Sequence, residues 1–378
     1  MADFAMIPAD GPLRVVLVGA GNMGRAWMRM IADTPTVRLV GLVDLALDLA
    51  RDAAAGHGLD IVVGDSLASV VAASEAQAVI NVTVPSAHHA VNTEALFLGL
   101  PVLCEKPIAP SVAETLSLMA AEEVSGQLLM TSQSRRYYPQ LARLKEAVSR
   151  LGAVGVVTTQ FFKAPHFGGF RDEMDHPLLV DMAIHAFDAA RYLLDADPVR
   201  VDCRSFNPEW SWYRGDASAA AIFEFEGGTR YTYTGSWCSP GLETSWNGDW
   251  RVSCAGGSVT WDGVGDPVVG TAAGPDGART STARGPGSRP EIAGALDEFV
   301  SALRTGATPS GDVHSNVHSL AMVEGAVLSA ATGRTVDVSA VLESAYQVAV
   351  RREERADVRA ALRGWGSALA GSGARAGG

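Results

Sequence analysis

The stretch RVVLVGAGNMG, residues 14–24, decides the expected fold. Its first part, Arg14–Val18, is a short β-branched run bounded by glycines, which predicts a buried parallel strand. Three glycines then follow in a G-x-G-x-x-G pattern, which is typical of a turn that binds a dinucleotide. In that pattern Gly19 permits the tight turn, Gly21 lets a pyrophosphate approach the backbone, and Gly24 lets helix and strand pack closely.

The residues after this turn predict which cofactor it holds. A helix is expected from about Asn22, so that Asn22 and Met23 offer backbone N–H groups and the positive helix end to the phosphates. A second strand, Val37–Val43, ends in Asp44, about 20 residues after the last glycine, where a carboxylate accepts hydrogen bonds from the adenosine ribose. No arginine adjoins Asp44, and Arg51 lies a helical turn away, so the pattern favours NAD over NADP.

Strands and helices alternate through the first third of the chain, which predicts a doubly wound parallel sheet. Thr83 and Pro85 follow the strand predicted at 78–82, and Glu105 and Lys106 follow the next strand. Ligands of such sheets bind outside the carboxyl ends of the strands, so we expect all four residues to line one crevice with the cofactor. Lys106 is a candidate hydrogen-bond donor to a substrate hydroxyl; the alternative is a surface lysine paired with Glu105.

Two acids and an imidazole recur along the apolar segment LLVDMAIHAFDAARYLL, residues 178–194. Asp181, His185 and Asp188 stand at i, i+4 and i+7, so on a helix they share one face. Buried charge is costly unless it is paired or used. Two interpretations therefore stay open: a core histidine held by two carboxylates, or a catalytic site.

Four of these features occur together and in order. The GAGNMG turn, Asp44, the Glu105-Lys106-Pro107 triplet and Asp181-x-x-x-His185 resemble the Gfo/Idh/MocA family of oxidoreductases, which includes inositol dehydrogenases and many sugar dehydrogenases. The resemblance extends from about residue 14 to about residue 338. It implies an α/β fold of two domains. An N-terminal Rossmann doubly wound parallel sheet is followed by a C-terminal α/β domain with an open, mostly antiparallel sheet.

The resemblance also implies which residues react and bind. The catalytic positions of the family match three residues: Lys106, Asp181 and His185. A histidine that the family commonly has near the cofactor matches His89, on the loop after Pro85, and His88 adjoins it. The chain departs from the family where a glycine-rich run usually precedes the acid, because DHPLLV stands at residues 175–180. This difference leaves the substrate open.

The chain is expected to divide into an NAD-binding Rossmann domain at 12–133, a substrate and oligomerisation domain at 134–350, and a helical to disordered tail at 351–378. Six β-rich runs predict a six-stranded sheet in the second domain: 154–162, 199–205, 218–226, 229–236, 250–255 and 259–262. The segment 263–290, rich in Gly, Pro, Ser and Thr, is interpreted as a flexible excursion.

The second part of the chain adds candidates for binding. Gln133 is expected to meet the nicotinamide carboxamide. Arg135 or Arg136 is expected to reach the substrate or the pyrophosphate, and the alternative is a solvated domain junction. Several aromatic residues lie near the predicted strands and suit either a sugar ring or plain packing: Trp210, Trp212, Tyr213, Trp237 and Trp246.

Histidines of this part raise the question of a metal. His166 and His176 are candidates for substrate recognition, and a zinc site from these two and Asp181 is conceivable. His314 and His318 have a zinc-like spacing, but without a third ligand a solvated first turn is the preferred interpretation. No metal is expected, since a lysine supplies the electrophile.

Composition limits the classes of protein that remain. The formal net charge of −12 argues against a general nucleic-acid binder, because phosphate binding needs a positive surface. The four cysteines form no C-x-x-C pair, which fits a reducing compartment. Neither a secretory signal nor an apolar run of about 18 residues is found, so a soluble cytoplasmic protein without membrane contact is expected.

Together these features predict an NAD-dependent oxidoreductase acting on a secondary hydroxyl of a sugar, an inositol-like polyol or a glycoside. His185 is the expected base, Lys106 would stabilise charge on the same oxygen, and Asp181 would orient a hydroxyl or the imidazole. One alternative is an NAD-recycling glycosidase or lyase that works through a 3-keto sugar, and another is a non-catalytic nucleotide-binding regulator. A homo-oligomer, dimer or tetramer, is expected through the C-terminal sheet.

Overall fold

The computed structural model describes residues 4–271, 280–281 and 289–371. By its contacts the chain divides into two compact units. The first unit comprises residues 1–134, 292–317 and 342–378, and the second comprises 135–291 and 318–341. This division differs from the predicted one after residue 291, because most of the later helices belong to the first unit.

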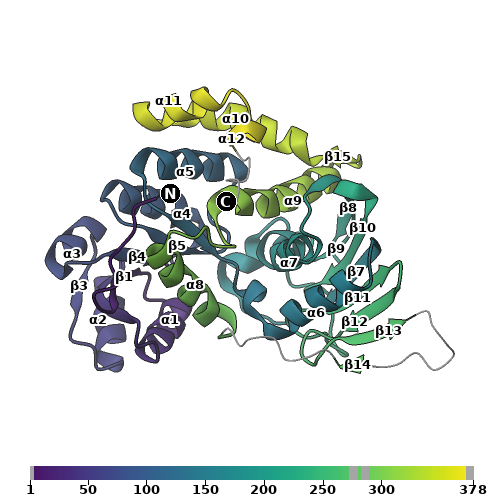
Figure 1. Cartoon of the computed structure of the whole chain (residues 1–378), viewed down its shortest axis with the longest axis horizontal. Coiled ribbons are helices and arrows are strands. Elements are labelled where there is room, and N and C mark those ends of the chain that lie inside the picture. Colours follow the sequence, from purple (N-terminus) through teal and green to yellow (C-terminus); the bar gives the residue numbers. More distant parts are fainter. Residues whose placement is uncertain (1–3, 272–279, 282–288, 372–378) are drawn as a thin grey trace. The chain divides into compact units, whose positions relative to one another are not determined.

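The first unit contains the predicted parallel sheet (Figure 1). Its six strands have the order β3-β2-β1-β4-β5-β6, and every neighbouring pair is parallel. This is the doubly wound Rossmann order, which reverses between β1 and β4, and the carboxyl ends of these strands border the ligand crevice of such folds. The strands are β1 Leu13–Val18, β2 Val37–Val43, β3 Val62–Gly64, β4 Ala78–Asn81, β5 Val102–Glu105 and β6 Leu129–Ser132.

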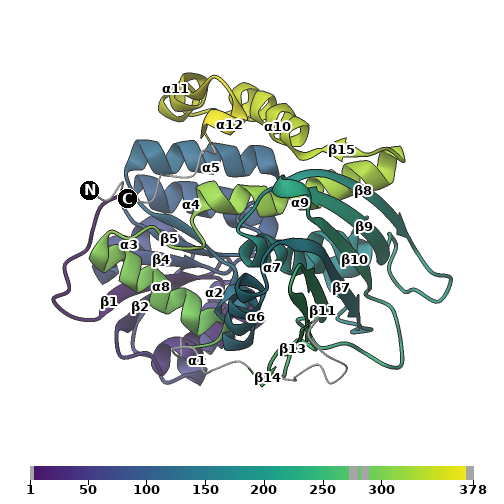
Figure 2. The ribbon, with the colours of Figure 1, turned by 45° about the vertical axis from the view of Figure 1, so that its right-hand side comes forward.

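Helices cover both faces of this sheet. In Figure 2, α4 and α5 lie on one face, and α1 and α8 lie on the other. Side chains of Ser66 and Ser111 cap the first turns of α3 and α5. The helices are α1 Asn22–Ala32, α2 Leu47–Gly56, α3 Leu67–Ser74, α4 Pro85–Phe97, α5 Val112–Ser125 and α8 Glu291–Thr305.

Helix α4 begins earlier than the sequence pattern predicted. Pro85 occupies its first turn, where a proline loses no hydrogen bond and its fixed φ favours the helix. His89 therefore lies within α4, and the prediction that it stands on a loop is wrong.

The second unit contains a mixed sheet of nine strands in the order β14-β13-β12-β11-β7-β10-β9-β8-β15. Only β7 and β10 pair in parallel, so the mostly antiparallel sheet is confirmed. Three strands were not predicted, because each is short and lacks alternation: β13 Val268–Thr271, β14 Thr280–Ser281 and β15 Val336–Asp337. The others are β7 Val154–Phe162, β8 Pro198–Phe206, β9 Ser218–Phe225, β10 Arg230–Ser236, β11 Asp249–Cys254 and β12 Gly257–Trp261.

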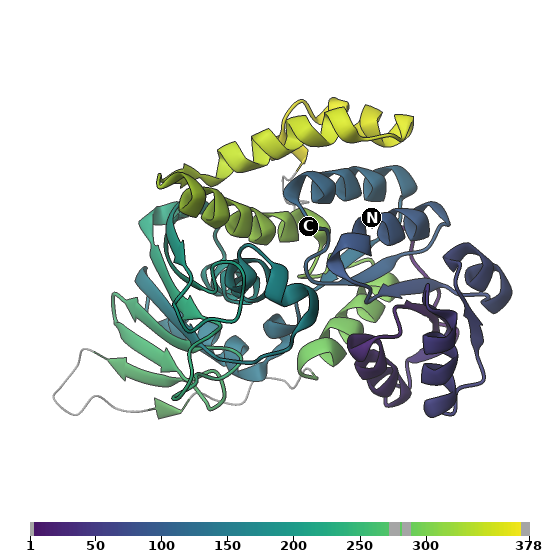
Figure 3. The same cartoon turned by 180° about the vertical axis from the view of Figure 1, so that it is seen from behind.

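One face of this sheet carries α6 Pro139–Arg150 and α7 Ile184–Leu194 (Figure 3). The buried Phe187 of α7 anchors the contact, since its ring lies 4.8 Å from that of Phe223 and 5.3 Å from that of Tyr233. Six π-helical residues, Leu178–Ala183, lead directly into α7. The predicted helix over 178–194 is thus a π-helical segment followed by an α-helix.

The chain after residue 312 forms four more helices, α9 Val313–Thr332, α10 Val338–Arg352, α11 Ala356–Trp365 and α12 Ala368–Gly371. Helix α11 packs on α5 within the first unit (Figure 1). The segment expected to be helical from 351 contains α11 and α12, and the tail expected after it, residues 372–378, lies outside the described part. Among the described residues, no helix is long and apolar enough to cross a membrane.

Candidate active site

The glycine turn of the first unit has three glycines with different surroundings. Gly19 has a φ of +108°, and a Cβ atom on it would lie 2.7 Å from the Val82 carbonyl oxygen. A Cβ atom on Gly24 would lie 2.0 Å from the Gly19 carbonyl oxygen, so α1 can approach the turn only with glycine there. Gly21 borders open space, and no side chain caps α1. The first N–H groups of α1 are therefore left for an anionic ligand or solvent.

Asp44 ties the end of β2 to this turn. Its Oδ2 accepts a hydrogen bond from the Ala20 N–H at 2.8 Å, and its Oδ1 accepts one from the Ala46 N–H at 2.9 Å. Each carboxylate oxygen keeps a second lone pair. The carboxylate is thus held in place with acceptor capacity for ribose hydroxyls, and the next side chain, Leu45, brings no positive charge.

Glu105, at the end of β5, is a structural anchor for the turn that carries Lys106. Its Oε1 accepts a hydrogen bond from the Trp27 indole N–H at 2.9 Å, and its Oε2 accepts one from the Lys106 backbone N–H at 3.3 Å. Burial raises the pKa of Glu105, and these two donors oppose the rise. The Glu105 carboxylate, which was expected to lie at the cofactor, therefore accepts hydrogen bonds from a side chain of α1 and from the backbone of its own turn.

Gln133 supplies the clearest match to a nicotinamide. Its side chain is 1 % exposed, and neither its amide oxygen nor its amide nitrogen has a hydrogen-bond partner among the described residues. A buried amide without partners is costly, and another carboxamide would satisfy its donor and its acceptor together. With the open glycine turn and Asp44, the residues of the first unit fit NAD.

In the second unit, Asp181 and Asp188 have separate partners. Oδ2 of Asp181 accepts a hydrogen bond from Arg171 Nε at 2.7 Å. Both oxygens of the buried Asp188 accept bonds from Arg136 at 2.7 Å, and Ser319 donates to Oδ1. Asp188 is therefore a structural ion-pair residue, and the interpretation in which it holds His185 is wrong.

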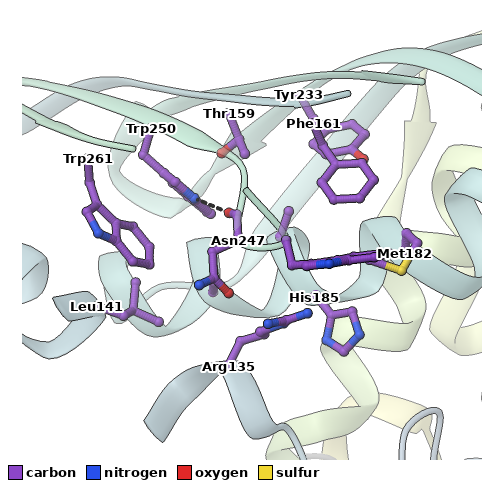
Figure 4. Close-up of a pocket in the computed structure, with 13 residues that line it drawn as sticks. Arg135, Leu141, Thr159, Phe161, Met182, His185, Tyr233, Asn247, Trp250 and Trp261 are labelled. Atoms are coloured by element: carbon purple, nitrogen blue, oxygen red, sulfur yellow. Dashed lines mark hydrogen bonds between the residues drawn. The ribbon is translucent and has the colours of Figure 1, made fainter. Parts of the chain in front are cut away.

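His185 borders a small cavity between α7 and the sheet of the second unit (Figure 4). Arg135 and Asn247 lie on its wall with aromatic rings from four strands. The hydroxyl of Tyr233 and Oδ1 of Asn247 are buried without a hydrogen-bond partner among the described residues. The cavity volume of about 20 Å³ suits one water molecule with polar neighbours and is too small for a sugar ring.

The other two candidate histidines are not brought together. Nε2 of His166 lies 3.3 Å from Asp172 Oδ2, and its ring stacks on Trp212. Nδ1 of His176 lies 3.4 Å from the Ser205 hydroxyl and 3.8 Å from Asp216 Oδ2. Across the described ranges, no three His, Cys, Asp or Glu residues are arranged to hold a metal ion. The conceivable zinc site is therefore not formed.

Three polar side chains were missed or misread from the sequence. Arg171 holds Asp181 and lies over the rings of Phe167 and Phe170, and no spacing in the sequence indicated this. His314 is buried against Glu122 at 2.9 Å, so the prediction of a solvated position is wrong. Of the two adjacent histidines, His88 is the buried one, whereas the sequence predicted that His89 lies near the cofactor. Apolar neighbours in α4 gave no signal that separates the two histidines.

These features define an NAD-binding oxidoreductase with a Rossmann domain. The model of the oxidoreductase family GFO_IDH_MocA, NAD-binding Rossmann fold, matches residues 13–133, and the model of the GFO/IDH/MocA C-terminal domain matches residues 141–260. Together the two models cover well over half of the chain. The chain belongs to the Gfo/Idh/MocA family, as its motifs indicated.

Relatives within the family differ in how much of the chain they share. Protein y4oX of Sinorhizobium fredii is 27% identical over 368 residues, 89% of this chain and 98% of that protein. Inositol 2-dehydrogenase 4 of Saccharopolyspora erythraea is 34% identical over 197 residues, 51% of this chain and 57% of that enzyme. The chain thus aligns with only about half the length of this inositol dehydrogenase.

Solved structures with the same fold include an oxidoreductase from Agrobacterium radiobacter in complex with NAD⁺, L-tartaric acid and magnesium. It has a TM-score of 0.78 and 20% identity, with 87% of this chain and 99% of that chain covered. Aldose-aldose oxidoreductase from Caulobacter crescentus has a TM-score of 0.75 and 22% identity, with coverage of 86% and 99%. At these identities the likeness establishes the fold alone.

Proposed function

We propose that this protein is an NAD-dependent dehydrogenase that oxidises a secondary hydroxyl of a polyol, sugar or glycoside, with inositol-like polyols as the first candidates. One observation supports the proposal most. A glycine turn, Asp44 and Gln133 that fit NAD occur in the same chain as Lys106 and the Asp181-x-x-x-His185 pair. A binding protein without turnover would have no use for these three ionisable residues.

The chemistry assigns each residue a task. Bound NAD⁺ supplies a nicotinamide ring that accepts hydride from the carbinol carbon. The carbinol becomes a carbonyl only if its hydroxyl proton also leaves, and in this proposal His185 accepts that proton. Lys106 donates a hydrogen bond to the same oxygen and stabilises its developing negative charge. Asp181, with Oδ2 held by Arg171, orients a second hydroxyl or the imidazole.

The relatives support the substrate class. Inositol 2-dehydrogenases of several bacteria and the rhizopine catabolism protein MocA align with about half of this chain. The structural neighbours with tartaric acid and glycerol show that related folds bind small polyhydroxylated molecules. A cytoplasmic location stays a prediction.

We also propose that a second copy of the chain covers the sheet face opposite α6 and α7. Ile222 and Val156 are 52% and 42% exposed on that face, and ion pairs of Arg200 and Arg230 with Glu224 lie beside them. Open sheet faces of this kind are usually covered. Sedimentation velocity is expected to give a dimer or tetramer, and Ile222→Asp is expected to shift it toward monomer. A wild-type monomer at micromolar concentration would contradict this.

The first experiment combines purified protein with NAD⁺ or NADP⁺ and a panel of inositols, free sugars and aryl glycosides. Absorbance of reduced cofactor is recorded beside product chromatography. We expect reduced NAD with at least one polyol, and a loss of at least about 100-fold in kcat for Lys106→Ala and His185→Ala. Lys145→Ala, which removes a partly exposed lysine paired with Asp195, is the matched control and is expected to keep wild-type activity.

The outcomes separate the alternatives. Substrate conversion without net NADH would indicate the NAD-recycling glycosidase or lyase. Nucleotide binding without any turnover across the panel, together with unchanged behaviour of the Lys106 variant, would favour the regulator and contradict the dehydrogenase.

A further inference from the structure

The ring of His88 contacts the backbone of two turns of the first unit. Its side chain is 1 % exposed and lies on the inner face of α4. Its Nδ1 lies 2.6 Å from the Pro107 carbonyl oxygen, and its Nε2 lies 3.1 Å from the Thr83 carbonyl oxygen. Pro107 directly follows Lys106, so one ring joins the lysine turn after β5 to the turn after β4.

Two asparagines extend this contact into a buried network. Asn92, one helical turn after His88, donates from Nδ2 to the Ile108 carbonyl oxygen at 3.2 Å. Asn81, at the end of β4, donates from Nδ2 to Asn92 Oδ1 at 2.8 Å and accepts at Oδ1 from the Thr83 hydroxyl at 2.7 Å. Both asparagines are fully buried. A satisfied polar network in a dry interior holds its members in one arrangement.

The number of ring protons decides which contact is the hydrogen bond. Both acceptors are carbonyl oxygens, and a neutral imidazole carries one N–H. Burial lowers the pKa of His88, although the two carbonyls act in the opposite direction. The shorter contact, 2.6 Å from Nδ1 to the Pro107 carbonyl oxygen, is the hydrogen bond by which the ring holds the lysine turn when Nδ1 carries the proton. An asparagine side chain places its amide nitrogen near the Nδ1 position.

We propose that His88 is a positioning residue for Lys106. It fixes the Lys106-Pro107 turn against the end of β4, so that the lysine amino group keeps one direction during turnover. Both ring nitrogens of His88 face protein carbonyls, so His88 acts through the lysine turn and not through a ligand. The proposal rests on the catalytic use of Lys106, which the test below examines separately.

The chain offers a control histidine on another helix. His57 lies at the C-terminal end of α2, and its Nδ1 lies 2.9 Å from the Ala53 carbonyl oxygen. His88→Ala is expected to lower kcat by about 10- to 100-fold, as misplacement of a catalytic group by about 1 Å does, with NAD⁺ affinity changed less than about twofold. His88→Asn is expected to recover most of kcat, and His57→Asn is expected to leave it unchanged.

A double variant tests whether His88 acts through Lys106. If it does, adding His88→Ala to Lys106→Ala causes no further loss of kcat. Two outcomes would overturn the proposal. One is a loss of kcat in the double variant equal to the product of the two single losses, and the other is wild-type kcat in a folded His88→Ala protein. Thermal unfolding of each variant identifies a protein that simply fails to fold, and the His88→Asn variant then carries the test.

A readout without turnover keeps this test independent of the proposed function. The chain has only three lysines, Lys106, Lys145 and Lys163. Reductive ¹³C-methylation of their amino groups therefore gives three lysine signals by NMR, and Lys106→Arg assigns one of them. His88→Ala is expected to move the Lys106 signal alone, and His88→Asn to restore it. A Lys106 signal that does not move in His88→Ala would contradict the positioning role. Activity that survives Lys106→Ala would contradict only the proposed function.

Discussion

Asp44 has two tasks at the scale of a single residue. Its carboxylate accepts a hydrogen bond from the backbone of the glycine turn, and we propose that its charge also repels the 2′-phosphate of NADP. Asparagine has the same shape without the charge, so it removes the repulsion of the phosphate and keeps most of the contact with the glycine turn. The two contributions can therefore be separated by substitution.

Asp44→Asn is expected to raise the Kd for NAD⁺ by about tenfold and to narrow the preference over NADP⁺, because the repulsion of the 2′-phosphate is lost. Asp44→Ala is expected to weaken both dinucleotides further, since the turn loses its acceptors. Fluorescence titration with each dinucleotide measures both effects. The control is Asp48→Ala, which removes a nearby exposed acid that pairs with Arg51. An unchanged NAD⁺/NADP⁺ ratio in Asp44→Asn would contradict this role.

Single residues also show which roles could be predicted from the sequence and which could not. The glycines, Asp44 and Gln133 could be proposed as cofactor residues because fixed backbone geometry links their spacing to a function, and these roles stay predictions. Asp188 and His89 could not be assigned, because their roles depend on partners far away in sequence, Arg136 and Ser117. Helical spacing predicts which residues share a face and does not predict what lies opposite that face.

At the scale of elements, strands with strong patterns were predicted best. The bounds of β2 and β7 agree with the predicted runs, since both segments are rich in residues that favour strands. The short strands β13, β14 and β15 form because neighbouring strands present open edges, which no local pattern reports. The π-helical residues 178–183 likewise follow from packing on the sheet.

The contact between β1, its turn and α1 gives a prediction at this scale. Gly24→Ala places a methyl group 2.0 Å from the Gly19 carbonyl oxygen, so α1 must move away from the turn. We expect NAD⁺ affinity to fall by at least about tenfold and the melting temperature to drop by several degrees. Gly56→Ala, at the end of α2 with open space around its Cβ position, is the control and is expected to be neutral or slightly stabilising. Wild-type NAD⁺ binding by Gly24→Ala would contradict the packing argument.

At the scale of the molecule, His314 joins three distant parts of the first unit. Its Nε2 donates to Glu122 of α5 at 2.9 Å, and its Nδ1 donates to the Gly371 carbonyl oxygen at 3.1 Å. Burial alone would lower the pKa of His314, but Glu122, Asp312 and the Gly371 carbonyl together outweigh burial and raise the pKa above its ordinary value. Protonated His314 satisfies both acceptors, so folding favours proton uptake here.

This linkage sets the sign of a pH dependence. A raised pKa in the folded state contributes stability that is full below about pH 6.5, the unfolded pKa, and is lost as pH rises through the folded pKa. The difference in unfolding free energy between wild type and His314→Gln is therefore expected to shrink from about pH 6 to about pH 9 in urea unfolding. The control is His57→Gln, since the His57 ring lies by the Ala53 carbonyl oxygen and faces no acidic partner among the ion pairs of the described residues. A difference that grows with pH would refute the assignment.

The position of Gly371 beside His314 bears on how the protein is made. Helices α11 and α12 pack against α5, which was synthesised more than two hundred residues earlier. On a ribosome that adds about 5–20 residues per second, α5 waits for its covering helices while the whole second unit emerges. During that interval the apolar surface for α11 is exposed, and the nascent chain is open to chaperones and to aggregation. Slow translation of the second unit should therefore lower the amount of protein in which the first unit is correctly folded.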